Sequence, residues 1–197
     1  IEKINVCFSY DNFLSILPLY HTYAFTVTLI TPLFLGAKVT YCNLGFKPED
    51  LSAIIKEAKV TILVGVPQLF SLLHRAIFDK IKKIPLFLMP FIFPFIRAKL
   101  HSKFGKSLRL LVSGGARLEA KTGKDLHNLS FKLVEGYGLT ETSPIATINP
   151  PLKVKFGSVG KPIPDVQIMI LNPDQSGIGE VLIKGPNVMK GYFKNPG

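Results

Sequence analysis

Residues 108–115, Leu108-Arg109-Leu110-Leu111-Val112-Ser113-Gly114-Gly115, decide the fold class of this 197-residue chain. Residues 108–112 form an essentially apolar run with no alternation of polar residues. Such a run predicts a strand that is covered on both faces, as in parallel sheets whose helices pack on either side. The glycines that follow at once predict that the strand ends in a tight turn.

Strand-like and helix-like stretches alternate on both sides of this run. We predict further strands at residues 13–17, 38–42, 60–66 and 131–134. We predict helices at residues 24–35, ended by Gly36, and at residues 118–129. A third helix begins at Pro48-Glu49-Asp50 and has Leu51, Ile54, Ile55 and Ala58 on one face. A fourth begins at Pro67 and runs through Leu69, Leu72, Leu73 and Ala76. This order predicts an α/β fold, a mainly parallel sheet with flanking helices and right-handed crossovers.

The pattern changes after Asn149-Pro150-Pro151. Residues 166–171 and 179–184 are predicted strands, and the turn residues Asn172-Pro173-Asp174 lie between them. We therefore assign residues 1–150 to the α/β part and residues 151–197 to the start of a small, β-barrel-like subdomain.

The composition narrows the classes of function. The chain has 24 Lys and Arg against 13 Asp and Glu, a net charge of +11, and 47% hydrophobic residues, so it can bury a core and favours anionic partners. No aromatic RNA-binding motif, zinc spacing or basic helix supports nucleic-acid binding. Cys7 and Cys42 are too few for a disulfide framework and form no metal-ligand pattern, which favours a cytoplasmic protein.

Two apolar segments resemble membrane segments. Residues 13–35 are interrupted by Pro18, His21 and Pro32, so we predict a buried strand, turn and helix rather than a span. The segment Ile84–Ile96 is too short to span, contains three prolines and is flanked by lysines and arginines. It either covers the core or lies on an anionic membrane surface, at the inner face of a membrane.

Three segments directly follow predicted strands, namely residues 18–25, 113–118 and 135–144. Ligands of open α/β sheets bind beyond the carboxyl ends of the strands, so we expect the three segments to meet at one crevice. In the last of them, Tyr137 offers a flat face for a base, while Thr140 and Glu141 offer a hydroxyl and a carboxylate to phosphates and a divalent cation. The stretch suits a nucleotide with Mg²⁺, and the alternative is a glycine-rich turn with a capping threonine.

Several short motifs occur together in one order. They are Leu17-Pro18-Leu19-Tyr20-His21, Ser113-Gly114-Gly115-Ala116, Tyr137-Gly138-Leu139-Thr140-Glu141, Gly157-Ser158-Val159-Gly160-Lys161-Pro162, and Gly179-Glu180-Val181 through Lys190-Gly191-Tyr192. The chain thereby resembles the adenylate-forming superfamily of acyl-CoA synthetases, luciferases and peptide-synthetase adenylation domains. It is most similar to long-chain fatty-acid:CoA ligases, and Phe78–Lys106 is its least typical part.

The resemblance implies an activity and its site residues. Members form an acyl-adenylate from ATP, Mg²⁺ and a carboxylate, and then pass the acyl group to CoA. By this resemblance Tyr137 stacks on adenine, Thr140 binds phosphate and Glu141 holds Mg²⁺, while His21 and Tyr23 lie at the acyl-carboxylate site and its entrance. The remaining residues implied to line the nucleotide and acyl pockets are Gly114, Gly115, Ala116, Glu135, Gly136 and Gly138.

The family's phosphate loop, its ribose-binding Asp and its C-terminal domain with the catalytic Lys are missing, so we expect a fragment without turnover of its own. An acyl-carrier-protein synthetase and a peripheral lipid-binding module are the competing interpretations. Without the resemblance, His21 is better explained as a helix cap. His74, His101 and His127 are expected to be surface or packing residues.

Overall fold

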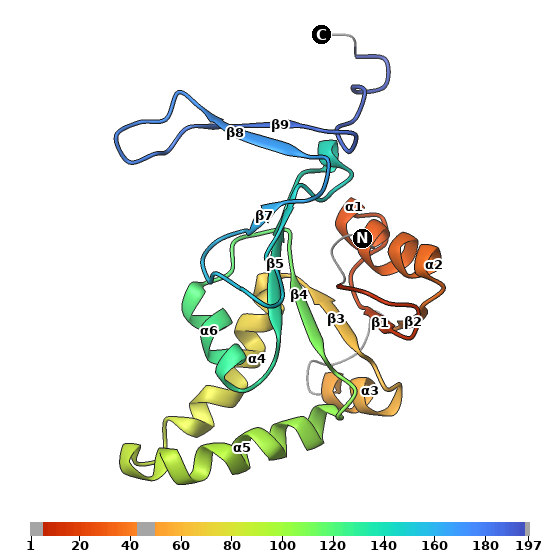
Figure 1. The fold of residues 1–197 in the computed structure, drawn as a ribbon. Coiled ribbons are helices and arrows are strands. Elements are labelled where there is room, and N and C mark those ends of the chain that lie inside the picture. Colours follow the sequence, from red (N-terminus) through yellow and green to blue (C-terminus); the bar gives the residue numbers. More distant parts are fainter. Residues whose placement is uncertain (1–5, 43–49, 196–197) are drawn as a thin grey trace.

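The computed structural model describes residues 6–42 and 50–195, and Figure 1 shows their arrangement. A seven-stranded sheet runs in the order β2-β1-β3-β4-β5-β6-β7. Its parallel part contains β1 (Asn12–Ser15), β2 (Lys38–Tyr41), β3 (Ile62–Gly65), β4 (Leu110–Ser113) and β5 (Leu133–Tyr137). The predicted α/β fold with a mainly parallel sheet is thus confirmed.

Strand β4, which the apolar run at residues 108–112 predicts, lies inside the sheet between β3 and β5. Leu110 and Leu111 are both buried but belong to two different core clusters, one on each face of the sheet. Successive side chains of a strand point to opposite faces, so an uninterrupted apolar run is what two covered faces require.

The first face is covered by α3 (Leu51–Glu57), α4 (Pro67–Ile81), α5 (Met89–Phe104) and α6 (Ala120–Asn128). Leu51 and Ile55 of α3 are buried, as its predicted face requires, whereas Pro48 and Glu49 of the predicted helix start lie outside the described residues.

Helix α4 begins at Pro67, as predicted. Phe70, Ile77 and Ile81 are buried, and Leu69 and Leu73 are partly buried against the same core cluster, whereas Leu72 and Ala76 are exposed. Apolar residues therefore lie on more than one side of this helix, and the periodicity of the sequence alone does not say which side packs on the sheet.

The second face carries α1 (Thr22–Phe25), the π-helical segment η2 (Thr26–Ile30) and α2 (Thr31–Leu35), which follow one another without a break. Gly36 ends them with a left-handed φ of 66°, a conformation that glycine adopts readily. Both the predicted helix and its stop at Gly36 are confirmed.

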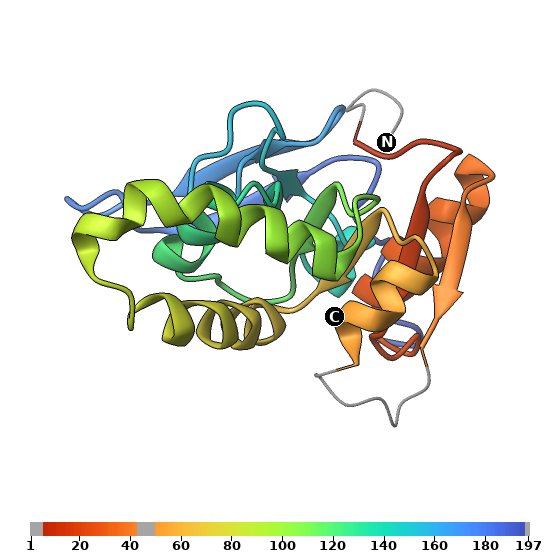
Figure 2. The same cartoon turned by 90° about the horizontal axis from the view of Figure 1, so that it is seen from below.

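The Pro-rich segment 84–96 forms the 3-10 turn η3 (Leu86–Leu88) and the first half of α5, which continues through Pro94. Figure 2, seen from below, shows α5 running across the molecule. Within the described residues, we find no helix with the length and apolar character needed to cross a bilayer.

Beyond β5 the strands become short. β5 pairs antiparallel with β6 (Thr147–Ile148), and β6 pairs with β7 (Lys161–Pro162). A separate antiparallel hairpin follows, formed by β8 (Gln167–Leu171) and β9 (Glu180–Lys184), which confirms the predicted small β unit. Since β7 still belongs to the first sheet, the proposed boundary at residue 150 stays a prediction.

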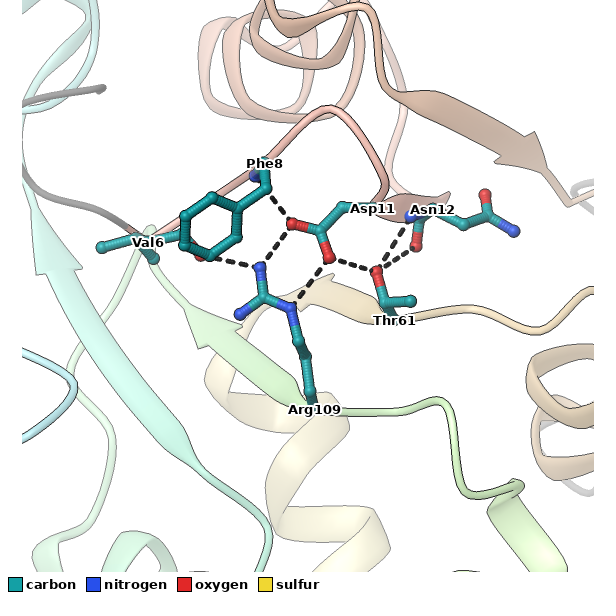
Figure 3. A network of polar contacts seen from close by, with 6 residues as sticks. All are labelled: Val6, Phe8, Asp11, Asn12, Thr61 and Arg109. Carbon is teal, nitrogen blue, oxygen red and sulfur yellow. Dashed lines mark hydrogen bonds and ion pairs between the residues drawn. The ribbon is translucent and has the colours of Figure 1, made fainter.

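A polar network holds the amino ends of three neighbouring strands together (Figure 3). Asp11, just before β1, accepts hydrogen bonds from Arg109 Nε at 2.8 Å, from a second Arg109 nitrogen and from Thr61 Oγ1 at 2.7 Å. Burial alone would raise the pKa of Asp11, but the hydrogen bonds from Arg109 and Thr61 outweigh it and lower that pKa. No local signal in the sequence predicts this network, although a charged residue at the start of a buried strand requires a partner.

Candidate active site

A cleft of about 690 Å³ opens at the carboxyl ends of β4 and β5. Three segments line it, among others: Ser113–Gly115, Gly136–Glu141 and His21–Tyr23. The first ends and follows β4, the second ends and follows β5, and the third lies at the start of α1. The three segments predicted to meet at one crevice do so, although Glu135, Gly136 and Tyr137 belong to β5 itself rather than to the turn after it.

Tyr23 and Gly114 pack against each other on one wall of the cleft. The Tyr23 hydroxyl donates to the backbone oxygens of Val112 at 3.3 Å and Gly65 at 3.4 Å, which fixes the ring beside the end of β4. A Cβ placed on Gly114 would lie 2.8 Å from Cζ of this ring. Glycine is therefore needed here for contact with Tyr23, whatever ligand enters the cleft.

The opposite wall is a tight loop after β5. A Cβ on Gly138 would lie 1.7 Å from the backbone oxygen of Pro144, so no other residue fits without moving the backbone. The Thr142 hydroxyl accepts from the Leu139 N–H at 2.8 Å. The short 3-10 turn η4 (Thr140–Thr142) that results presents Thr140 and Glu141 at the rim.

A second segment, residues 185–192, is bound to the back of this loop. Asn187 Nδ2 donates to the backbone oxygens of Thr142 at 3.1 Å and Ile145 at 2.8 Å. The Tyr192 hydroxyl donates to the Glu141 carboxylate, and this hydrogen bond lowers the pKa of Glu141. The candidate metal carboxylate is therefore held ionised at the mouth of the cleft.

His21 is exposed and caps α1, because its Nδ1 accepts the Tyr23 N–H at 3.2 Å. This is the helix-capping role weighed for it from sequence. The same residue also lines the cleft, so the cap orients the imidazole at the rim. With Nδ1 accepting, the neutral ring carries its proton on Nε2, where it can donate to an anionic group.

The deeper part of the cleft is apolar. Its lining includes Phe13, Val27, Ile145, Ile148 and Ile163. Cys7 also lines it, and burial raises the pKa of this thiol to about 11. A chain of methylene groups could enter here without leaving polar groups unpaired.

Two predicted site residues are not among the described residues that line the cleft, namely Ala116 and Glu135. Ala116 is exposed, whereas Glu135 is buried at 5% exposure. Burial raises the pKa of Glu135, opposed by hydrogen bonds from the backbone at Leu118 and Gly157. Glu135 therefore faces the start of α6, and the ligand roles of both residues stay predictions.

The other three histidines contact residues outside the cleft, in agreement with the packing role expected for them. His74 Nε2 lies 2.8 Å from Asp125 Oδ2 and joins α4 to α6, while His101 Nε2 lies 2.9 Å from the Leu129 oxygen. His127 packs edge-on against the ring of Phe156.

Sequence reasoning missed Asp165, Asn187 and Tyr192. Asp165 lines the cleft, and the other two contact its loop from a segment far along the chain. The motif around residues 185–192 was noticed, but nothing local in it shows that it docks on Thr142 and Glu141.

The donor set suits a nucleotide with one divalent cation. Mg²⁺ usually keeps several waters and binds through one or two carboxylates together with substrate phosphates. Glu141 supplies one accessible carboxylate beside the Thr140 hydroxyl. Among the described residues there is no cluster of three or more His, Cys, Asp or Glu, so an all-protein metal cage is not formed there.

Comparisons with known proteins agree with this geometry. A family model described as AMP-binding enzyme matches residues 2–193. The chain is 32% identical to a long-chain-fatty-acid–CoA ligase of Yersinia pestis, covering 94% of this chain and 31% of that protein. It is 28% identical to 4-coumarate-CoA ligase 1 of Narcissus pseudonarcissus, covering 99% of this chain and 34% of that protein.

A solved structure has the same fold. The crystal structure of ATP-bound MatB from Rhodopseudomonas palustris superposes with a TM-score of 0.73 at 27% identity, over 96% of this chain and 34% of that chain. The chain thus spans about a third of the length of these relatives.

Proposed function

The chain belongs to the AMP-binding enzymes, and from that membership we propose that the protein carrying it activates a fatty acid with ATP and passes the acyl group to CoA. The names of relatives support a ligase of this kind, and several of them are long-chain-fatty-acid–CoA ligases. The alternative acceptor of the acyl group is an acyl-carrier protein.

One observation carries the proposal. A single cleft joins an apolar interior, lined by residues such as Val27 and Ile148, to a polar rim that holds His21, Thr140 and Glu141. An acyl chain in the interior would place its carboxylate near the rim, where the phosphates of ATP would bind. The cleft therefore suits a substrate with a long apolar part and one anionic end.

In the proposed reaction, a carboxylate oxygen of the acid attacks the α-phosphorus of ATP and pyrophosphate leaves. The CoA thiol then attacks the acyl carbonyl, and AMP leaves. Neither step needs a protein nucleophile, so the chain contributes positioning and electrostatic stabilisation. A bound Mg²⁺ would neutralise charge on the phosphates.

We assign the roles as follows. Tyr137 stacks on adenine beside the backbone of Gly114 and Gly115. Thr140 donates its hydroxyl to a phosphate oxygen, and Glu141 holds the cation. His21 donates Nε2–H to the acid's carboxylate, and Tyr23 shapes the entrance.

The test measures pyrophosphate release by the full-length gene product with ATP and Mg²⁺. A panel of fatty acids of increasing length is compared with 4-coumarate, with and without CoA. We expect release that depends on a fatty acid and falls by at least 100-fold in Glu141→Ala, since one lost charge-stabilising group costs about that much. Glu180→Ala, which removes an exposed carboxylate of β9, is the matched control.

Release that depends on 4-coumarate alone would replace the fatty acid by an aromatic acid. Release that no acid stimulates would contradict the proposal.

A further inference from the structure

Helix α5 has an apolar side that packs on the core. Met89, Phe93, Ile96 and Leu100 pack against the larger core cluster, and Phe104 is buried within it. Their spacing of three and four residues places them along one side of the helix. The packing on this side accounts for only part of the apolar residues of the segment.

A second group of apolar residues, in η3 and the first half of α5, is exposed. Leu86 and Phe87 of η3 are 86% and 74% exposed, and Phe91 and Phe95 of α5 are 74% and 76% exposed. We call these four residues the aromatic ridge. Since soluble proteins rarely expose several large apolar side chains together, such a ridge indicates an interaction surface.

The segment that carries the ridge is rich in positive charge. At 100° per residue, Lys99 falls about 60° from the midline between Phe91 and Phe95, whereas Arg97 falls about 140° from it on the other side. Residues 80–106 hold seven Lys and Arg and no Asp or Glu, although the whole chain contains 13 acidic residues. The stretch therefore carries seven of the eleven net positive charges. One of them, Lys82, lies 3.7 Å from Asp79 in an exposed pair, which is a weak contact.

We propose that the aromatic ridge docks on the surface of an anionic lipid bilayer. Phenyl and leucine side chains enter the boundary between head groups and acyl chains, while lysines and arginines remain at the charged head groups. Protein interfaces are depleted of Lys, which argues against a protein partner for this surface. The proposal goes beyond the proposed function and does not depend on it.

The position of the ridge is compatible with an accessible cleft. The chain leaves α5 at Phe104 and enters the amino end of β4, whereas the cleft lies at the carboxyl ends of β4 and β5. Figure 1 accordingly shows α5 at the opposite end of the sheet from α1 and β7. A bilayer bound to the ridge would leave the mouth of the cleft in water.

The test uses co-sedimentation of the full chain with phosphatidylcholine vesicles, with and without phosphatidylserine. We expect the wild type to pellet only with the anionic vesicles. The double variant Phe91→Ser/Phe95→Ser should lose this binding, while Leu152→Ser/Ile178→Ser, which changes residues 92% and 71% exposed elsewhere, should retain it.

The charge is tested by Lys83→Gln/Arg97→Gln/Lys99→Gln. Each basic residue near an anionic surface contributes about a fivefold change in partitioning, so the triple variant should bind on the order of 100-fold more weakly. The control for net charge replaces three exposed lysines elsewhere by Gln, namely Lys153, Lys155 and Lys184, and should retain binding.

A spectroscopic measurement does not depend on losing binding. The chain contains no Trp, so Phe91→Trp reports only on the ridge and Leu152→Trp only on a remote loop. We expect anionic vesicles to shift the emission of Phe91→Trp to shorter wavelength and to leave Leu152→Trp unchanged. Equal pelleting of the wild type and Phe91→Ser/Phe95→Ser, or binding to RNA but not to vesicles, would overturn the proposal.

Discussion

Replacing Arg109 by Met tests how the sheet is held together at its amino edge. Arg109 donates to Asp11 through Nε at 2.8 Å and to the Val6 oxygen through Nη2 at 2.9 Å. The Asp11 side chain is fully buried, whereas that of Arg109 is 32% exposed. Met keeps most of the aliphatic contact, so the substitution mainly removes the partner of a buried carboxylate.

Removing one partner of a buried ion pair costs about 3–5 kcal/mol. Asp11 would retain hydrogen bonds from Thr61 and from the Phe8 N–H at 2.8 Å, and Arg109 is partly in water, so we expect about 3 kcal/mol, the lower end of that range. The measurement is urea unfolding at pH 7 followed by circular dichroism and extrapolated linearly to water. The exposed Arg75→Met of α4 should change stability by less than about 0.5 kcal/mol.

The loss should depend on pH with a defined sign. The pKa of Asp11 is lowered in the folded chain, so its contribution to stability is fully present above the ordinary pKa of 3.8 and is lost as pH falls through the folded value. Without Arg109, the effect of burial on this pKa is opposed by fewer hydrogen bonds. The difference between variant and wild type should therefore shrink below pH 3.8. A difference under about 1 kcal/mol at pH 7, or one that is constant down to pH 3, would refute the reasoning.

Three further substitutions or modifications test the cleft. Gly138→Ala places Cβ 1.7 Å from the backbone oxygen of Pro144. This substitution should lower kcat/KM for ATP in the full-length gene product by more than tenfold. Unchanged kinetics would show that the loop is not rigid. Tyr23→Phe removes hydrogen bonds of 3.3 and 3.4 Å and should cost about 1 kcal/mol in urea unfolding, and no loss would mean these bonds contribute nothing. The pKa of Cys7 is raised from 9.0 to about 11. At pH 8 iodoacetamide should therefore alkylate Cys7 about 100-fold more slowly than a free thiol, as measured by mass spectrometry. An ordinary alkylation rate would contradict the burial of this thiol.

The elements of the fold could be predicted from the sequence because each has a local signal. The apolar run of β4, the glycine that stops α2 and the turn between β8 and β9 all depend on residues close together in the chain. The face of α4 could not be predicted, because its apolar residues lie on more than one side and only the packed sheet selects among them.

The cleft was predictable in outline, since segments that follow parallel strands meet at one edge of the sheet. Its supporting contacts were not. Asn187 reaches the loop at Thr142 across 45 residues, and Tyr192 reaches Glu141 across 51. Contacts of this separation depend on tertiary structure, and neither residue type distinguishes itself in the sequence. The reasons for Gly114 and Gly138 also emerged only when Tyr23 and Pro144 were placed against them.

The central claim, proposed above, is that the full-length gene product transfers the adenylyl group of ATP to the carboxylate of a fatty acid. A fatty acid labelled with ¹⁸O in its carboxylate tests this directly, because the oxygen that attacks phosphorus stays with AMP when CoA takes the acyl group. The account predicts AMP that carries one ¹⁸O from the acid, analysed by mass spectrometry, together with unlabelled pyrophosphate. Unlabelled AMP, or label in inorganic phosphate alongside ADP, would contradict it.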